Sequence, residues 1–96
     1  MIGIYAHFTI QPGKQAEFEA LMTEFVTKVK ATEPGATVYQ LCKSALAEDD
    51  YFMLELYADQ AAFDAHAKTE HMAALGGKIG HFLAHPPKIM RGPAIF

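Results

Sequence analysis

The chain has 96 residues, of which 51% are apolar, and a formal net charge of −3 at pH 7. This length fits one domain, residues 1–96, and leaves no room for a second. No apolar run approaches the ~20 residues of a membrane span, and no basic patch interleaves with aromatic residues, so we expect no membrane and no nucleic-acid partner. The single cysteine, Cys42, fits a reducing compartment, and we expect a soluble protein of the cytoplasm.

The apolar pattern predicts the elements of the first half of the chain. Residues 2–10 alternate between apolar and other side chains, which is the period of a strand. Residues 15–31 carry apolar side chains at i, i+3, i+4 and i+7 spacing, which predicts an amphipathic helix. The motif TEPG, residues 32–35, ends this helix because proline blocks its continuation and glycine permits a bend. Two further strands are predicted at 37–44 and 51–58.

Two shorter helices and a last strand are predicted in the second half of the chain. One helix covers residues 60–67 and follows Asp59, and another begins at Glu70 and follows Thr69, because both preceding residues are good N-caps. The apolar stripe of the second helix continues up to a pair of prolines, which we expect to end it. The tail, residues 88–96, contains glycine and proline and is expected to form an edge strand.

The order β, α, β, β, α, β is typical of the ferredoxin-like α+β fold, in which helices cover one face of a four-stranded antiparallel sheet. The third predicted strand, YFMLELYA, is apolar on both faces, whereas a strand that faces water usually alternates between apolar and polar residues. We therefore expect the second face of the sheet to pack against a second copy of the chain in a homodimer.

The main candidate site lies where the third strand meets the helix over residues 60–67. Phe63 and His66 share one helix face, so if Phe63 packs on the sheet, His66 lies above the third strand. Glu55 and Tyr57 project from that strand on one face. A carboxylate beside an imidazole orients the ring and gives a pair suited to proton transfer. The alternative interpretation, which the residues leave open, is a histidine and glutamate that simply tie the helix to the sheet.

Aromatic and charged residues suggest the kind of ligand. Arg91, the only arginine, either pairs within the fold or attracts an anionic or phenolate-like ligand.

His81 and His85 have a spacing that can chelate a metal, but no carboxylate follows to complete the site, and we expect no metal. Tyrosines on strands favour a pocket for a flat organic ligand, although each of them has core packing as its other role. They are Tyr5, Tyr39, Tyr51 and Tyr57.

The stretches EPGATVYQL, from Glu33, and YFMLELYADQAAFDAHAKTEHM, from Tyr51, resemble the antibiotic biosynthesis monooxygenase family of small dimeric α+β barrel proteins. The shared motifs are a Pro-Gly turn before a strand with tyrosine, a Glu-x-aromatic strand end, and a helix with His-x-x-Thr-x-His. With the opening FTIQPGKQAEFEAL, the likeness covers nearly the whole chain. The motif residues are Pro34, Gly35, Tyr39, Glu55, Tyr57, His66, Thr69 and His71.

The resemblance implies a homodimer whose sheets join into a barrel, with a pocket between sheet and helices in each subunit. Several members oxidise phenols or quinols with molecular oxygen and without metal or flavin, because an electron-rich phenolate can itself reduce oxygen. Such an enzyme needs a base and a dry pocket. The resemblance implies His66 and Glu55 as catalytic residues. It implies a substrate-binding set of Tyr39, Tyr57, Phe63, His71 and Arg91.

Two departures from the family pattern narrow the expected reaction. Tyr57 stands where the third strand usually ends in Glu-x-Trp. The Asn/Trp/His set of the related haem-degrading members is missing, since His66 and Gly76 stand at the positions of their tryptophan and their haem-ligating histidine. Haem degradation is therefore not expected.

These observations favour a cofactor-independent monooxygenase that acts on a small quinol or polyphenol. One alternative is an isomerase or degrading enzyme for a small oxygenated metabolite, with His66 and Glu55 moving protons. Another is a non-catalytic dimeric module that binds an aromatic ligand, because a fold by itself does not fix a function.

Overall fold

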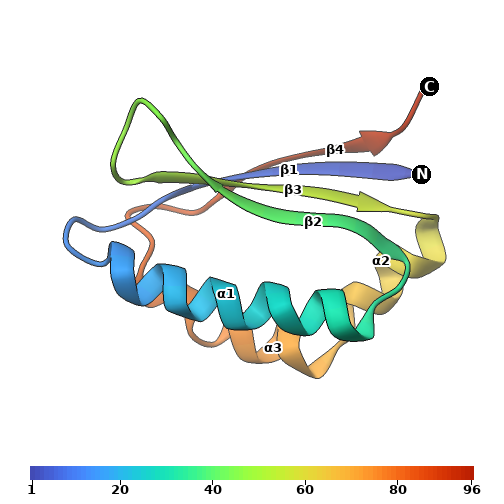
Figure 1. Ribbon diagram of the computed structural model, residues 1–96, viewed down its shortest axis with the longest axis horizontal. Helices are drawn as coiled ribbons and strands as arrows, with labels where there is room; N and C mark the ends of the chain where they lie inside the picture. The colour runs from blue at the N-terminus through green and yellow to red at the C-terminus, as the bar shows by residue number, and fades with distance from the viewer.

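The computed structural model describes residues 1–96 and contains one four-stranded sheet with the strand order β2-β3-β1-β4. All neighbouring strands pair antiparallel, and the helices lie together on one side of the sheet (Figure 1). The predicted ferredoxin-like α+β fold is therefore confirmed. The elements are β1 (Ile2–Thr9), α1 (Gln15–Thr32), β2 (Ala36–Lys43), β3 (Asp50–Tyr57), α2 (Gln60–Ala67), α3 (Glu70–Gly76), the 3₁₀ turn η1 (Ile79–His81) and β4 (Lys88–Pro93).

The core lies between the sheet and α1. Alternate residues of each strand point toward the helices, as the period of two requires. The buried positions of α1 recur every three or four residues, which gives that helix one apolar stripe facing the sheet. The buried apolar residues are Ala6, Phe8, Ile10, Phe18, Met22, Phe25, Val29, Tyr39, Tyr51, Met53, Tyr57 and Leu75.

The two short helices begin at the predicted caps. The Asp59 carboxylate accepts a hydrogen bond from the backbone N–H of Ala62 at 2.8 Å, and the Thr69 hydroxyl accepts one from the N–H of Met72 at 3.2 Å. Each cap provides a partner for an N–H that has no carbonyl partner at the start of a helix. No helix of the chain combines the length and the apolar character needed to cross a membrane.

The third helix is shorter than predicted. It ends at Gly76 and does not continue to the prolines, because Gly76 and Gly77 together disfavour helix and leave the backbone free to change course. The N–H of Gly77 bonds back to the carbonyls of Ala73 and Leu75, and the chain then makes the short turn η1. The expected continuous stripe is therefore broken into two pieces, one on α3 and one on η1 and the residues after it.

The other face of the sheet carries no helix (Figure 1). Large apolar side chains on this face keep much of their surface exposed, from 40% for Leu54 to 75% for Met90. Tyr5 and Val38 are exposed to a similar extent as Leu54. We call Tyr5, Val38, Leu54 and Met90 the open apolar face. A single chain leaves this face in contact with water, as the sequence of β3 led us to expect.

Candidate functional site

A cluster of polar side chains lies beneath α2, where α1 ends and α3 begins. Glu33 is the first residue after α1, and its backbone leaves the helix with φ −121° and ψ 80°. His66 lies on the last turn of α2 and His71 on the first turn of α3. Tyr39 comes from β2, on the face that points toward the helices. Four separate segments therefore contribute to one cluster.

Glu33 connects the two histidines. Its Oε1 lies 2.9 Å from Nδ1 of His66, and its Oε2 lies 2.5 Å from Nε2 of His71. The Glu33 side chain is only 10% exposed, and those of His66 and His71 are 4% and 15% exposed. Both carboxylate oxygens are thus used by imidazole nitrogens in a nearly dry environment, where such hydrogen bonds are strong.

One assignment of protons satisfies this whole network. Nδ1–H of His66 and Nε2–H of His71 donate to Glu33, and the Tyr39 hydroxyl, 3.4 Å from Nε2 of His66, donates to that nitrogen. Nδ1 of His71 then keeps a free lone pair. No fully buried polar atom of a side chain lacks a hydrogen-bond partner, and this Nδ1 has none within the chain, so solvent must reach it.

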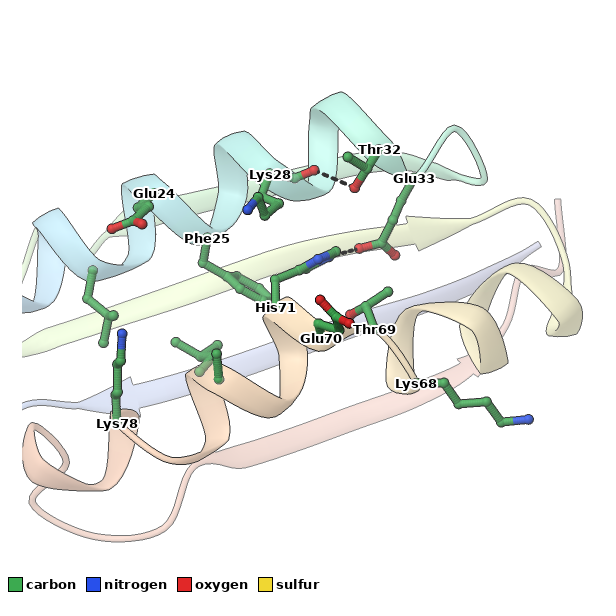
Figure 2. Close-up of a pocket in the computed structure, with 13 residues that line it drawn as sticks. Glu24, Phe25, Lys28, Thr32, Glu33, Lys68, Thr69, Glu70, His71 and Lys78 are labelled. Atoms are coloured by element: carbon green, nitrogen blue, oxygen red, sulfur yellow. Dashed lines mark hydrogen bonds and ion pairs between the residues drawn. The ribbon is translucent and has the colours of Figure 1, made fainter.

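The solvent reaches His71 through a groove of about 730 Å³ between α1 and α3. Figure 2 shows Glu33 and His71 pointing toward each other in this groove, with the Phe25 ring beside them and Lys68 directed away. His66 is not part of the lining, although its Nδ1 contacts Glu33, which is. The groove therefore runs between two helices, whereas the resemblance implied a pocket between sheet and helices. The lining residues are Leu21, Glu24, Phe25, Lys28, Thr32, Glu33, Lys68, Thr69, Glu70, His71, Ala74, Leu75 and Lys78.

The predicted position of His66 over β3 is confirmed, but its Nδ1 is hydrogen-bonded to Glu33 and no hydrogen bond joins its ring to Glu55. Phe63 and His66 both pack against Tyr57 of β3, with ring centroids 5.4 Å apart in each case. The Glu55 carboxylate instead accepts a hydrogen bond at 2.6 Å from the hydroxyl of Tyr57, its neighbour on the same face of the strand. Glu33 takes the place beside His66, because the end of α1 brings its carboxylate to Nδ1 of that ring.

Burial changes the acid–base behaviour of the side chains under α2. It raises the pKa of the Glu55 carboxyl above its ordinary value of 4.5, and the hydrogen bond from Tyr57 only partly offsets this effect. Burial also raises the pKa of the Tyr39 and Tyr57 phenols, and the nearby Glu55 carboxylate raises both further. The two phenols therefore stay neutral near pH 7 and act as hydrogen-bond donors.

The predicted substrate-binding residues lie in different places. His71 lines the groove, whereas Tyr39 and Tyr57 are buried behind it at 5% and 0% exposure. Phe63 and Arg91 form a contact of their own, with the guanidinium carbon 5.1 Å from the centre of the ring. No group of three or more His, Cys, Asp or Glu side chains is arranged to hold a metal ion.

Sequence reasoning missed Glu33. Its motif, TEPG, was interpreted as a helix stop and as a turn before a strand, with no role for the carboxylate. A signal was present nonetheless, because an acidic side chain directly after a helix lies near the negative end of the helix dipole. A carboxylate in that position is disfavoured unless it finds donors elsewhere, and here the two imidazoles supply them.

Comparison with known proteins decides the family. The model of the family described as antibiotic biosynthesis monooxygenase matches residues 1–76. The chain belongs to this family. The matched range contains Glu33, His66 and His71, whereas Arg91 lies outside it.

Relatives of the antibiotic biosynthesis monooxygenase family support this assignment. YcnE of Bacillus subtilis (strain 168), a candidate monooxygenase, is 30% identical over 91 residues, which cover 95% of each chain. The crystal structure of a candidate antibiotic biosynthesis monooxygenase from Caulobacter crescentus CB15 is 41% identical, with a TM-score of 0.94 over 99% of this chain and 90% of that one. Rv0793 from Mycobacterium tuberculosis, at 22% identity, shares the fold, with a TM-score of 0.90 over 99% of this chain and 95% of that one.

Proposed function

We propose that the protein is a monooxygenase that oxidises a small quinol or polyphenol with molecular oxygen, with His71 as the base. The observation that carries this proposal is the free Nδ1 of His71 in the groove, with the opposite nitrogen of the ring held by Glu33. A base needs an accessible lone pair and a fixed ring orientation, and this arrangement supplies both.

In the proposed reaction, a ring hydroxyl of the substrate gives its proton to Nδ1 of His71. The resulting phenolate is electron-rich and transfers electrons to oxygen, so the substrate itself replaces a metal or flavin. For a simple quinol, one oxygen atom enters the ring and the other leaves as water. The product is a hydroxyquinone, and the quinol supplies all four electrons.

The surroundings of His71 suit this chemistry. Leu21, Phe25 and Leu75 give the groove an apolar wall for an aromatic ring. When His71 takes up a proton, the Glu33 carboxylate stabilises the positive imidazolium directly behind it. His66 holds the second oxygen of Glu33 and so keeps the carboxylate from rotating. In this proposal His66 supports the base, and contacts of Phe63 and Arg91 with substrate stay predictions.

Oxygen uptake with a panel of quinols tests the proposal. We expect the purified protein to consume oxygen, to insert one atom of ¹⁸O₂ into the product, and to stop under anaerobic conditions. His71→Ala is expected to lower kcat/KM by about 10²–10⁴-fold, the range of general base catalysis. His81→Ala, at an exposed histidine of η1, is the matched control and should retain activity.

Other outcomes separate the alternative functions. Turnover that continues without oxygen would indicate the isomerase or degrading enzyme. Saturable binding of an aromatic ligand with no turnover would indicate the non-catalytic binding module. Release of hydrogen peroxide without ¹⁸O in the product would indicate simple oxidation of the quinol and would contradict the monooxygenase.

We also propose that the open apolar face meets its copy in a homodimer. Tyr5, Val38, Leu54 and Met90 leave a large apolar surface in water in the single chain, which is typical of an interface. Analytical ultracentrifugation should show a dimer. Leu54→Lys should shift the chain toward the monomer, because it places charges at the centre of that face.

A further inference from the structure

We infer that Gly35 is a positioning residue for the site. Its lack of a side chain sets how closely α2 approaches the turn between α1 and β2, and thereby holds His66 against Glu33. The inference deepens the proposed function and rests on it for its effect on turnover, whereas its effect on the two histidines is independent of any substrate.

The approach of α2 to this turn leaves no space for a methyl group. A Cβ atom added to Gly35 would lie 2.5 Å from Cβ of Ala62. Ordinary contacts begin at 3.4 Å, so α2 and the turn would have to separate by roughly 0.9 Å. The Ala62 methyl cannot rotate out of the way, because Cβ is fixed to the backbone of the helix.

Close approach is the only requirement for glycine at this position. The one glycine with a positive φ is Gly13, at 84°, so Gly35 has a backbone conformation that alanine can adopt. The only atoms near the added Cβ are those of Ala62. In the folded molecule, the methyl group of an alanine at position 35 would therefore clash only with α2.

The contact between Gly35 and Ala62 lies close to the hydrogen bond between His66 and Glu33. Ala62 and His66 are one turn apart on the same face of α2, and Glu33 stands two residues before Gly35. The N–H of Ala58, which lies between β3 and α2, donates to the carbonyl of Gly35 at 2.8 Å and holds the turn to the end of β3. A separation of 0.9 Å along the bond would lengthen the 2.9 Å contact of His66 with Glu33 to roughly 3.8 Å, beyond hydrogen-bond range.

The effect reaches the groove through Glu33. Once His66 no longer holds Oε1, the carboxylate is free to rotate and its hydrogen bond to His71 is no longer fixed in direction. The ring of His71 then loses the orientation that keeps Nδ1 toward the groove. Loss of a group that orients a functional histidine typically lowers activity about 10–100-fold.

A pair of substitutions tests this inference by rescue. Gly35→Ala introduces the clash, and Ala62→Gly removes the methyl group that it meets. In the double variant the added Cβ would face Cα of residue 62 at 3.6 Å, which is an ordinary contact. Gly80→Ala is the matched control, because nothing lies within 4 Å of a Cβ added there.

The primary measurement is ¹⁵N NMR of the imidazole rings without substrate, which reports the tautomer of each histidine. Gly35→Ala should lose the single Nδ1–H tautomer of His66 and the single Nε2–H tautomer of His71, and lower quinol turnover at least tenfold. Gly35→Ala/Ala62→Gly should restore both signals, whereas Gly80→Ala should leave them unchanged. Ala62→Gly alone should keep the wild-type tautomers.

Three results would overturn the inference. They are wild-type tautomers in Gly35→Ala, failure of the double variant to recover them, and loss of the tautomers in Gly80→Ala. If Gly35→Ala does not fold, the double variant decides alone, since the inference requires it to fold and to show the wild-type signals. A wild-type protein that is inactive on quinols but shows this NMR pattern would refute the proposed function and leave the role of Gly35 intact.

Discussion

Glu33 and Glu55 are two glutamates that lie under α2 in different environments. Glu33 accepts from two imidazole N–H groups and lines the groove, whereas Glu55 accepts from one phenol. Burial raises the pKa of Glu55, so its neutral form is favoured more than in water. The difference teaches that partners, more than position on the strand or helix, decide which carboxylate can support a base.

The largest expected effect is the difference in kcat/KM between variants of Glu33 and Glu55. Glu33→Gln replaces one acceptor oxygen by an NH₂ group that faces an imidazole donor, and should lower kcat/KM for quinol oxidation about 100-fold. Glu55→Gln should keep it within about threefold, because its oxygen can still accept from Tyr57. Oxygen-uptake kinetics measure both, with Glu17→Gln, at an exposed position of α1 outside the groove, as the control. A larger loss in Glu55→Gln than in Glu33→Gln would restore the original assignment of Glu55 as a catalytic residue.

A smaller effect concerns stability and pH. Because the folded pKa of Glu55 lies above 4.5, the native protein holds this proton more tightly than the unfolded chain. The stabilisation that this proton gives to the folded protein is full below pH 4.5, and it is lost as the pH rises through the folded pKa of Glu55. Glu55→Gln removes this dependence, so its Tm relative to wild type should rise by a few degrees between pH 4 and pH 8.

Thermal melts across this pH range measure the change, with Glu48→Gln in the exposed β2–β3 turn as the control. A difference in Tm that stays constant with pH would show that burial does not act on the protonation of Glu55.

The smallest expected effect tests the far end of the Glu33 network. Tyr39→Phe removes a long hydrogen bond of 3.4 Å to His66 and should lower the free energy of unfolding by about 1 kcal/mol. Turnover should fall less than in Glu33→Gln, since both imidazoles keep their carboxylate. Urea unfolding and oxygen-uptake kinetics check this. A loss equal to that of Glu33→Gln would place Tyr39 within the catalytic unit.

The sequence predicted those features that depend on local pattern. Alternation gave the strands, the three-to-four spacing gave α1, and Asp59 and Thr69 marked the starts of the two short helices. Helical spacing also placed Phe63 and His66 over β3 correctly. These features depend on the spacing of neighbouring residues, which can be read from a single sequence.

The features that the sequence did not predict depend on how separate segments pack. The partner of His66 is set by the turn after α1 and by the approach of α2 to Gly35, neither of which has a periodic signal. The helix that begins at Glu70 was predicted to continue up to the prolines, whereas it ends at Gly76, with Gly77 directly after it. The groove beside His71 lies between α1 and α3, which are far apart in the sequence.

The brevity of α3 has a consequence for how the protein fails under stress. This helix has seven residues and ends in glycine, so it is the segment expected to detach first when the structure loosens. Detachment would carry His71 away while the four hydrogen-bonded strands stay intact. Mild denaturant should then abolish the proposed quinol oxidation before the circular dichroism of the sheet changes, so that loss of activity becomes the earliest sign of damage.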